Sequence, residues 1–583
     1  MENKTAKIPV ASHGLHRHNY NYPWLSSINF GDVMPCYYNP VRKGERDSPK
    51  AGVFSQLMPI AHNAFATGRF NFKAIFVPYK LVWRPWYAFD QQKEYYSNGT
   101  SMIPGRYPFI TQNELLKAII DNYATRSVDP DISDFRVIAS SSIQPSDASR
   151  YDFTAAGRRV FRVLCALGCC PSFVSDDATP INILHVLCYI KAYSDYYFPN
   201  NYVGNTKYKI LALFFDRDTI DFTPFATDFL QALDICSLNF YENTIFDLAW
   251  DNPATPNVLQ NLPNVSISDV TDPLGNLGSV QVTNTAVDNG TPAVTDSSAS
   301  GVSGFTQYIL NALKSVTLWA KRRQLSGARL LDSFLASRGI TLPNDSARIS
   351  YFLGERNIEI EVSGVENNTD TNLGELAGRG IASSGNNPLS FECRPDDDGI
   401  FFVIVSPIPD ANFPILFDGF ANRRDYLDNY TAEYDKLGSA AVPSAVVARS
   451  LDGLVNNIVN PQQQRVFGFL NQYWDEIQEK PRLLGDFILN SRGAIELQAY
   501  HTFRLFAANN ISAYAHHSYD FIRMSDSEQY QRLFYSEEQE NLMLFLRWYG
   551  SQYKEKLPLG DSYDWDDDEM NRKINIVVGG SQK

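Results

Sequence analysis

The spacing of strand-like segments constrains this chain most. From Phe70 to Val77 apolar and polar residues alternate, which predicts a strand that ends at Pro78. The sequence "NIEIEV" at 357–362 repeats the pattern, and "GIFFVIVSPIP" at 399–409 has the apolar run of a buried strand closed by Pro407. Because the strands are separated by very unequal intervals, we expect a β-scaffold whose connections contain helices, not a regular α/β alternation.

Three segments have a helical pattern. Thr179 as a cap and Pro180 in the first turn predict a helix that continues through Tyr193, with an apolar face at a spacing of three and four residues. Further helices are expected at about Thr306–Arg323 and Glu537–Tyr549.

The composition is that of a globular chain. Of the 583 residues, 44% are apolar, 13% aromatic and 20% charged, and the 32 Tyr and 37 Phe favour strands and the buried centres of interfaces. The net charge of −14 argues against electrostatic binding of nucleic acid over the whole surface, so any such contact has to be local.

The cysteines and apolar runs indicate the cellular setting. The seven cysteines are scattered and contain no C-x-x-C pair, so neither a disulfide framework nor a zinc site is indicated and a reducing compartment fits best. No apolar run approaches the length of a membrane helix, and the first residues lack a signal peptide's apolar core. We expect a soluble protein that is made and used inside a cell.

One segment differs from its surroundings. Residues 251–304 contain no aromatic residue, Lys, Arg or Glu, and consist mainly of small and polar residues with turn-forming sequences. Such a segment can bury little, so we expect a projecting surface loop. The alternative is a disordered linker between two domains.

The sequence contains little that indicates catalysis. It has no G-x-x-x-x-G-K-[ST], H-E-x-x-H or G-x-S-x-G motif. The histidines of "HGLHRH" have no nearby ligand partners, and the acidic run 561–569 lacks the spacing of a Ca²⁺ loop. The sequence therefore indicates no catalytic site and no cofactor; a structural divalent cation is possible but not indicated.

Seven stretches, in order along the chain, resemble one family. They are "IFVPYKLVWRPWYAF" (75–89), "YIKAYSDYYF" (189–198), "LWAKRRQLSGARLLDSFLASRGI" (318–340), "YFLGERNIEIEVSGV" (351–365), "LGELAGRG" (373–380), "YTAEYDKLG" (430–438) and "VFGFLNQYWDEI" (466–477). They are similar to the major capsid proteins of the Microviridae, the small icosahedral single-stranded DNA phages, and especially to the gokushovirus-like lineages.

The resemblance implies a mainly β fold: an eight-stranded antiparallel jelly roll with long, partly helical insertions. It implies an N-terminal arm at 1–30 and a single jelly-roll capsid domain at 31–583 built from discontinuous segments. Sixty copies, assembled through pentamers, would close a T=1 shell around a circular single-stranded DNA genome. The expected locations are the virion and, during assembly, the host cytoplasm.

The resemblance also implies partners. They are encapsidated DNA, basic DNA-binding and pilot or scaffolding phage proteins, and a bacterial surface receptor contacted by exposed loops, without membrane insertion. The alternative is a secreted β-rich glycan-binding protein or glycan-active enzyme.

Two sets of residues are candidates for these roles. The locally basic N-terminus would face DNA, with cations on phosphates and rings stacked on bases, through Lys4, Lys7, His13, His16, Arg17, His18, Tyr20, Tyr22 and Trp24. Alternatively, this arm laces over a neighbouring subunit. Core or inter-subunit anchors would be Phe76, Trp83, Trp86, Phe89, Tyr193, Tyr196, Trp319, Phe467 and Trp474.

Overall fold

A computed structural model gives the fold of the chain. The structure describes residues 4–10, 15–58, 68–97, 100–126, 136–139, 149–170, 178–199, 205–242, 315, 334–335, 338–344, 348–366, 376–385, 387–409, 418–423, 428–432, 439–443, 446, 466–471, 473–477, 519–524, 542–555 and 574–580. The expected loop at 251–304, the acidic run 561–569, His13, Trp319 and nearly all of the expected helix at 306–323 lie outside the described residues.

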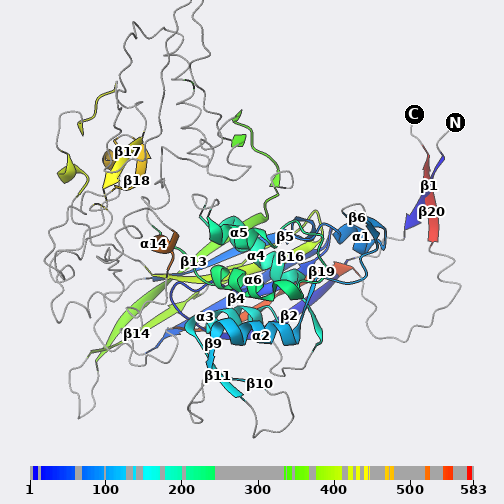
Figure 1. The fold of residues 1–583 in the computed structure, drawn as a ribbon, viewed down its shortest axis with the longest axis horizontal. Helices are drawn as coiled ribbons and strands as arrows, with labels where there is room; N and C mark the ends of the chain where they lie inside the picture. Colours follow the sequence, from blue (N-terminus) through cyan, green and yellow to red (C-terminus); the bar gives the residue numbers. More distant parts are fainter. Residues whose placement is uncertain are drawn as a thin grey trace, which may run out of the picture.

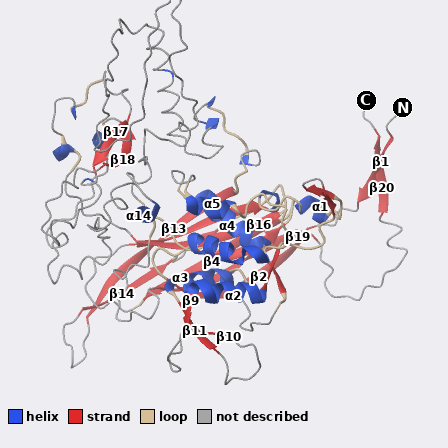
Figure 2. Ribbon diagram, viewed as in Figure 1, coloured by secondary structure: helices blue, strands red, loops and turns tan. Residues whose placement is uncertain are grey.

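The protein is mixed α/β, and antiparallel β-sheets dominate it (Figures 1 and 2). Among the described residues, its largest sheet has nine strands. Eight form a continuous path in the order β2 (Leu15–Ile28), β19 (Leu542–Glu555), β4 (Arg46–Leu57), β14 (Leu376–Ser383), β13 (Tyr351–Glu366), β5 (Gly68–Pro78), β16 (Gly399–Pro409) and β3 (Met34–Val41). The ninth, β15 (Leu389–Ser390), pairs with β4.

The pairing of the eight path strands is nested along the chain. The first pairs with the last, β2 with β19; the second with the seventh, β3 with β16; the third with the sixth, β4 with β14; and the fourth with the fifth, β5 with β13. Three further pairings, β4 with β19, β5 with β16 and β13 with β14, join these pairs into one sheet. Strands that are distant in sequence therefore lie side by side.

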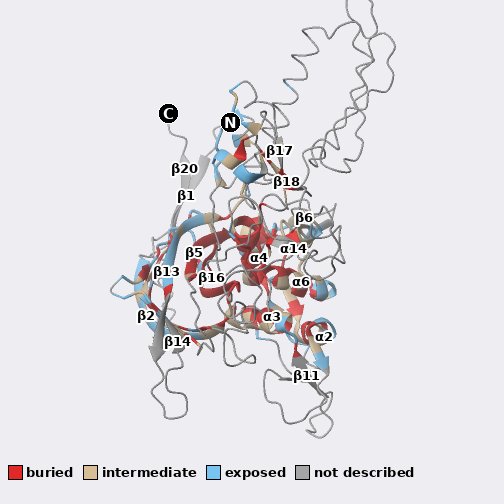
Figure 3. Ribbon diagram, turned by 90° about the vertical axis from the view of Figure 1, so that its left-hand side faces the viewer, coloured by how far each residue is buried: buried red, intermediate tan, exposed pale blue. Residues whose placement is uncertain are grey.

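The sheet curls without closing into a barrel. Among the described residues, β2 and β3 at the two ends of the path share no ladder of hydrogen bonds. Their side chains nevertheless meet: the ring of Tyr37 on β3 lies 6.1 Å from Tyr20 on β2 and 4.9 Å from Trp548 on β19, measured between centroids. The strands thus curve around a shared buried interior (Figure 3).

Helices cover one half of the sheet. Five of the described helices in the connection between β5 and β13 form this layer: α2 (Gln112–Tyr123), α3 (Ala155–Ala166), α4 (Leu184–Tyr196), α5 (Thr206–Ala212) and α6 (Ala226–Cys236). The ring of Tyr189 on α4 lies 6.3 Å from Phe402 on β16, and Lys73 on β5 lies 4.5 Å from the ring of Tyr197. This layer buries β5 and β16 on both faces and makes the fold mixed α/β where the sequence predicted a mainly β chain.

Two predicted strand ends can be compared with the structure. β5 ends at Pro78, as predicted, whereas β16 continues past Pro407 to Pro409. The Pro407 carbonyl accepts a hydrogen bond from the Gly31 N–H at 2.8 Å. In an antiparallel strand the nitrogen and the carbonyl of one residue point to the same side, so the missing N–H of Pro407 faces the chain before β3 and costs no bond to β5.

The helix predicted at Glu537–Tyr549 is wrong. Its second half belongs to β19, between β2 and β4, where Leu542, Leu544, Leu546 and Trp548 are buried and alternate with more exposed residues. The predicted start of the other helix is also wrong: 180–182 form β12 (Pro180–Asn182), which pairs with β8 (Phe109–Thr111). The helix α4 begins at Leu184, whose N–H donates to Asn182 Oδ1 at 3.0 Å.

The remaining elements are short. Small sheets pair β1 (Lys4–Val10) with β20 (Ile574–Gly580), β6 (Tyr95–Ser97) with β7 (Thr100–Met102), β17 (Ser439–Pro443) with β18 (Val466–Asn471), and β11 (Ser149–Phe153) with both β9 (Ala124–Arg126) and β10 (Arg136–Ala139). The short helices include η1 (Tyr79–Leu81), α1 (Trp86–Asp90), η4 (Thr223–Phe225), η6 (Phe420–Asn422), η9 (Trp474–Glu476) and α14 (Tyr519–Ile522). Among the described helices, none has the length and apolar character needed to cross a membrane.

Candidate functional site

The outer face of β2, β19 and β4 carries cations and tyrosines in register. Along these strands alternate residues face outward, and the pairing aligns them in rows of three. One row is Arg17–Tyr553–Arg46, and two residues along each strand the next is Asn19–Ser551–Ser48. The rows Asn21–Tyr549–Lys50 and Pro23–Arg547–Gly52 follow. We call Arg17, Arg46, Lys50, Arg547, Tyr549 and Tyr553 the cation–tyrosine face.

Short contacts hold these side chains in place. The guanidinium carbons of Arg17 and Arg46 lie 6.0 and 5.8 Å from the centre of the Tyr553 ring, one on each neighbouring strand. Arg17 Nε donates to Asn19 Oδ1 at 3.1 Å, and Arg547 Nε donates to Asn21 Oδ1 at 3.2 Å. The rings and cations therefore form an ordered surface with cation–π contacts.

An open groove of about 860 Å³ lies over this face. It is lined by Arg17, Lys50 and Tyr549 on the three strands, by residues 353–356 near the start of β13, and by residues 390–392 from the last residue of β15 onward. Arg46 Nη2 donates to the wall residue Glu392 at 3.0 Å. The lining contains four cations, Arg17, Arg46, Lys50 and Arg356, against two carboxylates, Glu355 and Glu392. The groove is therefore positive by two charges on a chain whose net charge is −14.

This chemistry suits an anion that carries flat groups. Guanidinium groups bind phosphate or carboxylate oxygens through charge-assisted hydrogen bonds, and exposed rings provide stacking surfaces. Screening limits the reach of exposed charges to about 8 Å at physiological salt, so a local positive groove acts largely independently of distant acidic residues.

A second polar group lies inside the curled sheet. Asp47 on β4 is 1% exposed and accepts hydrogen bonds from Tyr37 Oη at 2.6 Å and from Asn39 Nδ2 at 2.7 Å, both on β3. Gln552 Nε2 on β19 donates to Tyr37 Oη at 3.2 Å, and Lys554 Nζ donates to Asn39 Oδ1 at 3.3 Å. Burial raises the pKa of Asp47, while hydrogen bonds from Tyr37 and Asn39 oppose that shift. The cluster connects β3 to β4 and β19 through the interior.

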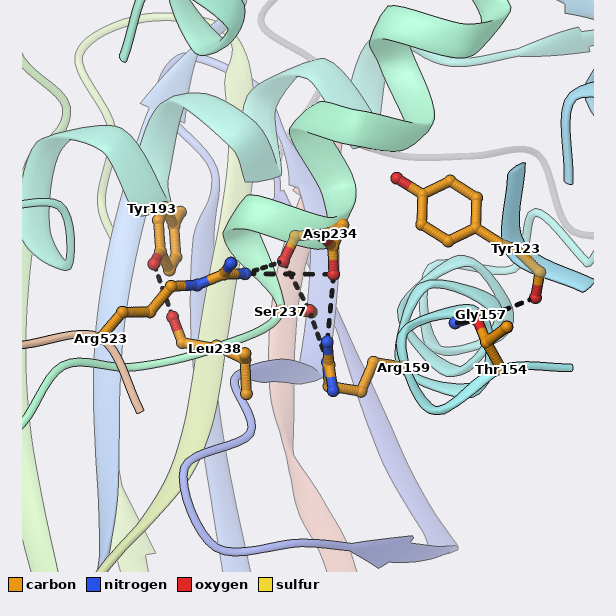
Figure 4. Close-up of polar contacts among 9 residues, drawn as sticks. All are labelled: Tyr123, Thr154, Gly157, Arg159, Tyr193, Asp234, Ser237, Leu238 and Arg523. Carbon is orange, nitrogen blue, oxygen red and sulfur yellow. Dashed lines mark hydrogen bonds and ion pairs between the residues drawn. The ribbon is translucent and has the colours of Figure 1, made fainter. Parts of the chain in front are cut away.

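A third polar cluster supports the helix layer (Figure 4). Arg159 on α3 donates through Nη2 to Asp234 Oδ1 on α6 and through Nε to Ser237 Oγ, both at 3.2 Å. Arg523, which follows α14, donates through Nη2 to the Asp234 carbonyl at 2.8 Å. Burial lowers the pKa of Arg159, and the nearby Asp32 and Asp234 oppose that shift. These contacts attach the segment 519–524 to α3 and α6.

The structure places the predicted DNA-facing residues in different environments. Residues 15–28, half of the expected arm, form β2 of the main sheet. Arg17 is on the outer face, whereas Tyr20 and Trp24 pack against the buried core. His16 and Tyr22 are exposed and His18 is half-buried. Lys4 and Lys7 lie in β1, paired with β20, and their side chains are outside the described part.

Sequence reasoning missed most of the cation–tyrosine face. Arg46, Lys50, Arg547, Tyr549 and Tyr553 were not candidates. Alternation along 46–57 places Arg46 and Lys50 on one side of a strand, and alternation along 542–555 does the same for Arg547, Tyr549 and Tyr553. Most of the second segment has the pattern expected of a helix, so its alternation was not used. Only the register of β19 between β2 and β4 brings the two sets together.

The aromatic candidates that the structure describes pack within the chain. Trp83 and Trp86 form a small buried cluster with Leu184, against which Phe89 packs. Phe76, Tyr193 and Phe467 belong to the main core, as does Trp474. Tyr193 Oη donates to the Leu238 carbonyl at 2.6 Å (Figure 4), and Tyr196 Oη donates to the Ser350 carbonyl.

Within the part of the chain that the structure describes, no group of three or more His, Cys, Asp or Glu side chains is arranged to hold a metal ion. No protein-family model matches the chain, and no curated protein matches it.

Proposed function

We propose that the protein is the major capsid protein of a small icosahedral single-stranded DNA phage of the Microviridae type, and that its eight path strands form a jelly roll. The observation that carries the proposal is the nested pairing of β2 with β19, β3 with β16, β4 with β14 and β5 with β13. A long antiparallel ribbon rolled on itself gives this order in two four-stranded halves, β2-β19-β4-β14 and β13-β5-β16-β3. Jelly rolls of this kind recur in viral capsids.

The stretches that resemble the family fall on the structural framework. "IFVPYKLVWRPWYAF" covers the end of β5, η1 and α1; "YIKAYSDYYF" lies in and just after α4; and "YFLGERNIEIEVSGV" forms most of β13. "VFGFLNQYWDEI" spans β18 and η9. Most of 318–340 and of 430–438 lies outside the described residues, and 376–380 of "LGELAGRG" lies in β14. Three of the seven stretches thus fall on the main sheet and one on the helix that packs against it, which favours a shared architecture.

An exposed apolar surface supports assembly of identical copies. Next to the cation–tyrosine face, the register places Leu25, Phe545 and Phe54 in one row, and Met543 beside Gln56 and Ile381 in the next. Leu25 is 74% exposed and Phe54 is 46% exposed. We call Leu25, Phe54, Ile381, Met543 and Phe545 the apolar rows. Clustered exposed apolar side chains are typical of protein–protein contacts, and in a shell the partner is another copy of the chain.

The role in this proposal is structural, not catalytic. Sixty copies, grouped as pentamers, enclose a circular single-stranded genome in the virion after assembly in the host cytoplasm. Basic DNA-binding and pilot or scaffolding proteins accompany them, and exposed loops meet a bacterial receptor. A chain with a net charge of −14 cannot itself neutralise a genome, which favours a separate basic partner.

The test is the size of the purified protein. Negative-stain micrographs and sedimentation of recombinant protein should show pentamers or closed shells. A small species that stays monomeric under assembly conditions and binds oligosaccharides would contradict the proposal and favour a glycan-binding protein.

A further inference from the structure

We propose that the groove over the cation–tyrosine face binds single-stranded nucleic acid, with cations on the phosphates and tyrosines stacked on unpaired bases. The inference rests on the proposed function, because a shell protein of this kind meets a single-stranded genome. It goes beyond it by assigning the contact to one face of β2, β19 and β4.

The first argument is the distribution of charge. The groove lining has four cations against two carboxylates, and the outward side chains of the rows from Arg17–Tyr553–Arg46 to Leu25–Phe545–Phe54 include four cations and no carboxylate. Arg17 and Lys50 are exposed, and they stand on the two strands that flank β19. Cations on both sides of a central strand can contact successive phosphates of a chain that crosses the strands, so the groove fits a polyanion better than a neutral glycan.

The second argument is the position of the rings. Tyr549 and Tyr553 are four residues apart on β19, which corresponds to roughly 13 Å along a strand. Tyr549 is 38% exposed and lines the groove. Tyr553 lies between the guanidinium groups of Arg17 and Arg46, which hold the ring in place; Arg46 is also paired with Glu392, while Arg17 is exposed beside the groove. Regularly placed rings among cations are the recurring design of sequence-tolerant single-strand sites.

The third argument selects single strands over duplexes. The rings of Tyr549 and Tyr553 line the groove together with residues 353–356 and 390–392. A base must be unpaired and turned outward to stack there, whereas a duplex hides its base faces and presents only its phosphates. An acidic peptide would use the cations without needing the rings.

The experiment uses the full-length purified subunit and a fluorescent oligothymidine of about 20 nucleotides. Tyr549→Ala should weaken binding roughly 5- to 150-fold, the loss expected for one stacked base. Arg17→Ser with Lys50→Ser should reduce the slope of log affinity against log salt by roughly 1.4, because each phosphate contact on a single strand contributes about 0.7. Arg17→Lys with Lys50→Arg should restore the slope.

A matched control separates the groove from overall charge. Lys93→Ser with Lys117→Ser removes the same charge at exposed positions elsewhere, on the segment after α1 and on α2, and should leave the affinity and the slope unchanged. Circular dichroism and thermal unfolding confirm that each variant is folded.

Any of three results would overturn the assignment. The control and groove variants could bind the oligonucleotide alike, or a duplex of the same sequence could bind the wild type as tightly as the single strand does. Polyglutamate could also bind as tightly as the oligonucleotide, with an affinity that Tyr549→Ala leaves unchanged. The binding assay needs no particles. If the subunit binds the oligonucleotide through the groove but forms no shells, the result counts against the proposed function alone. Shells without groove-dependent binding would count against this inference alone.

Discussion

Tyr37 on β3 donates a hydrogen bond to the buried carboxylate of Asp47 on β4, with the two oxygens 2.6 Å apart. The two strands follow one another in the chain but do not pair in the sheet, because β3 pairs with β16 and β4 pairs with β14 and β19. The hydrogen bond thus crosses the interior and ties β3 to β4 across the curl of the sheet. Because the outer face of β4 carries Arg46 and Lys50, the same curl sets the shape of the groove.

We predict that Tyr37→Phe destabilises the subunit by roughly 1–3 kcal/mol, because a buried carboxylate loses a donor while the packing of the ring is kept. Urea unfolding of the purified subunit measures the change. Tyr38→Phe on the same strand is the control, because Tyr38 is 37% exposed and should change stability by less than about 0.5 kcal/mol. Equal stability of Tyr37→Phe and the wild type would contradict the role of this bond.

The pH dependence of stability should reveal the ionisation of Asp47. Burial raises its folded-state pKa above the ordinary value of 3.8, so the folded subunit holds the proton more tightly than the unfolded chain. The stability that comes from Asp47 is therefore fully present below pH 3.8 and is lost as the pH rises through the raised folded pKa. Tyr37, Asn39 and Lys554 lie around the carboxylate. All three are present both in the wild type and in the Asp47→Asn variant that tests this dependence.

Asp47→Asn removes this titration, so the wild type should gain stability relative to Asp47→Asn as the pH is lowered from 7 to about 4. Subtracting the two urea-unfolding curves cancels the titration of other groups. A difference that stays constant or moves the other way over this range would show that the carboxylate is not held at a raised pKa.

The elements predicted well were those whose pattern is local. β5 and its end at Pro78 follow from alternation and a proline, and the alternation of 357–362 lies in β13. β19 was misread because Leu, Met and Glu have high helix propensity, while its strand partners β2 and β4 lie hundreds of residues earlier in the chain. The groove could not be predicted for the same reason, since Tyr553 meets Arg17 and Arg46 only through that long-range register.

Sequence could not decide whether the tryptophans after β5 face the core or a neighbouring subunit. Trp83 is fully buried within the chain, so Trp83→Ala should cost about 3–5 kcal/mol and greatly reduce the yield of soluble, folded subunit. Tyr96→Ala is the matched control, because Tyr96 is 71% exposed and should change stability by less than about 0.5 kcal/mol. A folded Trp83→Ala subunit of normal stability that fails only in assembly would make Trp83 an interface residue.

Thiol reactivity should single out one cysteine. Of the seven, Cys170 is exposed and Cys165 is partly exposed, while the others are buried, and burial raises the pKa of Cys165 and raises that of Cys169 to about 12. Because the thiolate is the reacting form, an aromatic disulfide reagent at pH 8 should modify Cys170 first, forming a mixed disulfide and releasing one aryl thiolate. Cys165 Sγ, 3.3 Å away, can then displace the second aryl thiolate to close a Cys165–Cys170 disulfide, while the buried thiols react only on unfolding. Cys170→Ser should abolish the fast phase. A fast phase that persists in this variant would place another thiol at the surface.

The apolar rows should matter for assembly more than for folding. Leu25 is 74% exposed, so Leu25→Asp should leave the unfolding curve of the subunit nearly unchanged while placing a charge where another copy of the chain would pack. We expect sedimentation to show loss of shells and accumulation of free subunits. Leu25→Asn tests whether a polar group without charge is enough to disrupt assembly.

Shells of the wild type should survive about 1 M salt, where the screening length falls to about 3 Å, because apolar contacts do not depend on unscreened charges. Normal shells from Leu25→Asp would show that this face is not an interface between copies, and wild-type shells that dissolve in salt would show that the contacts are mainly ionic.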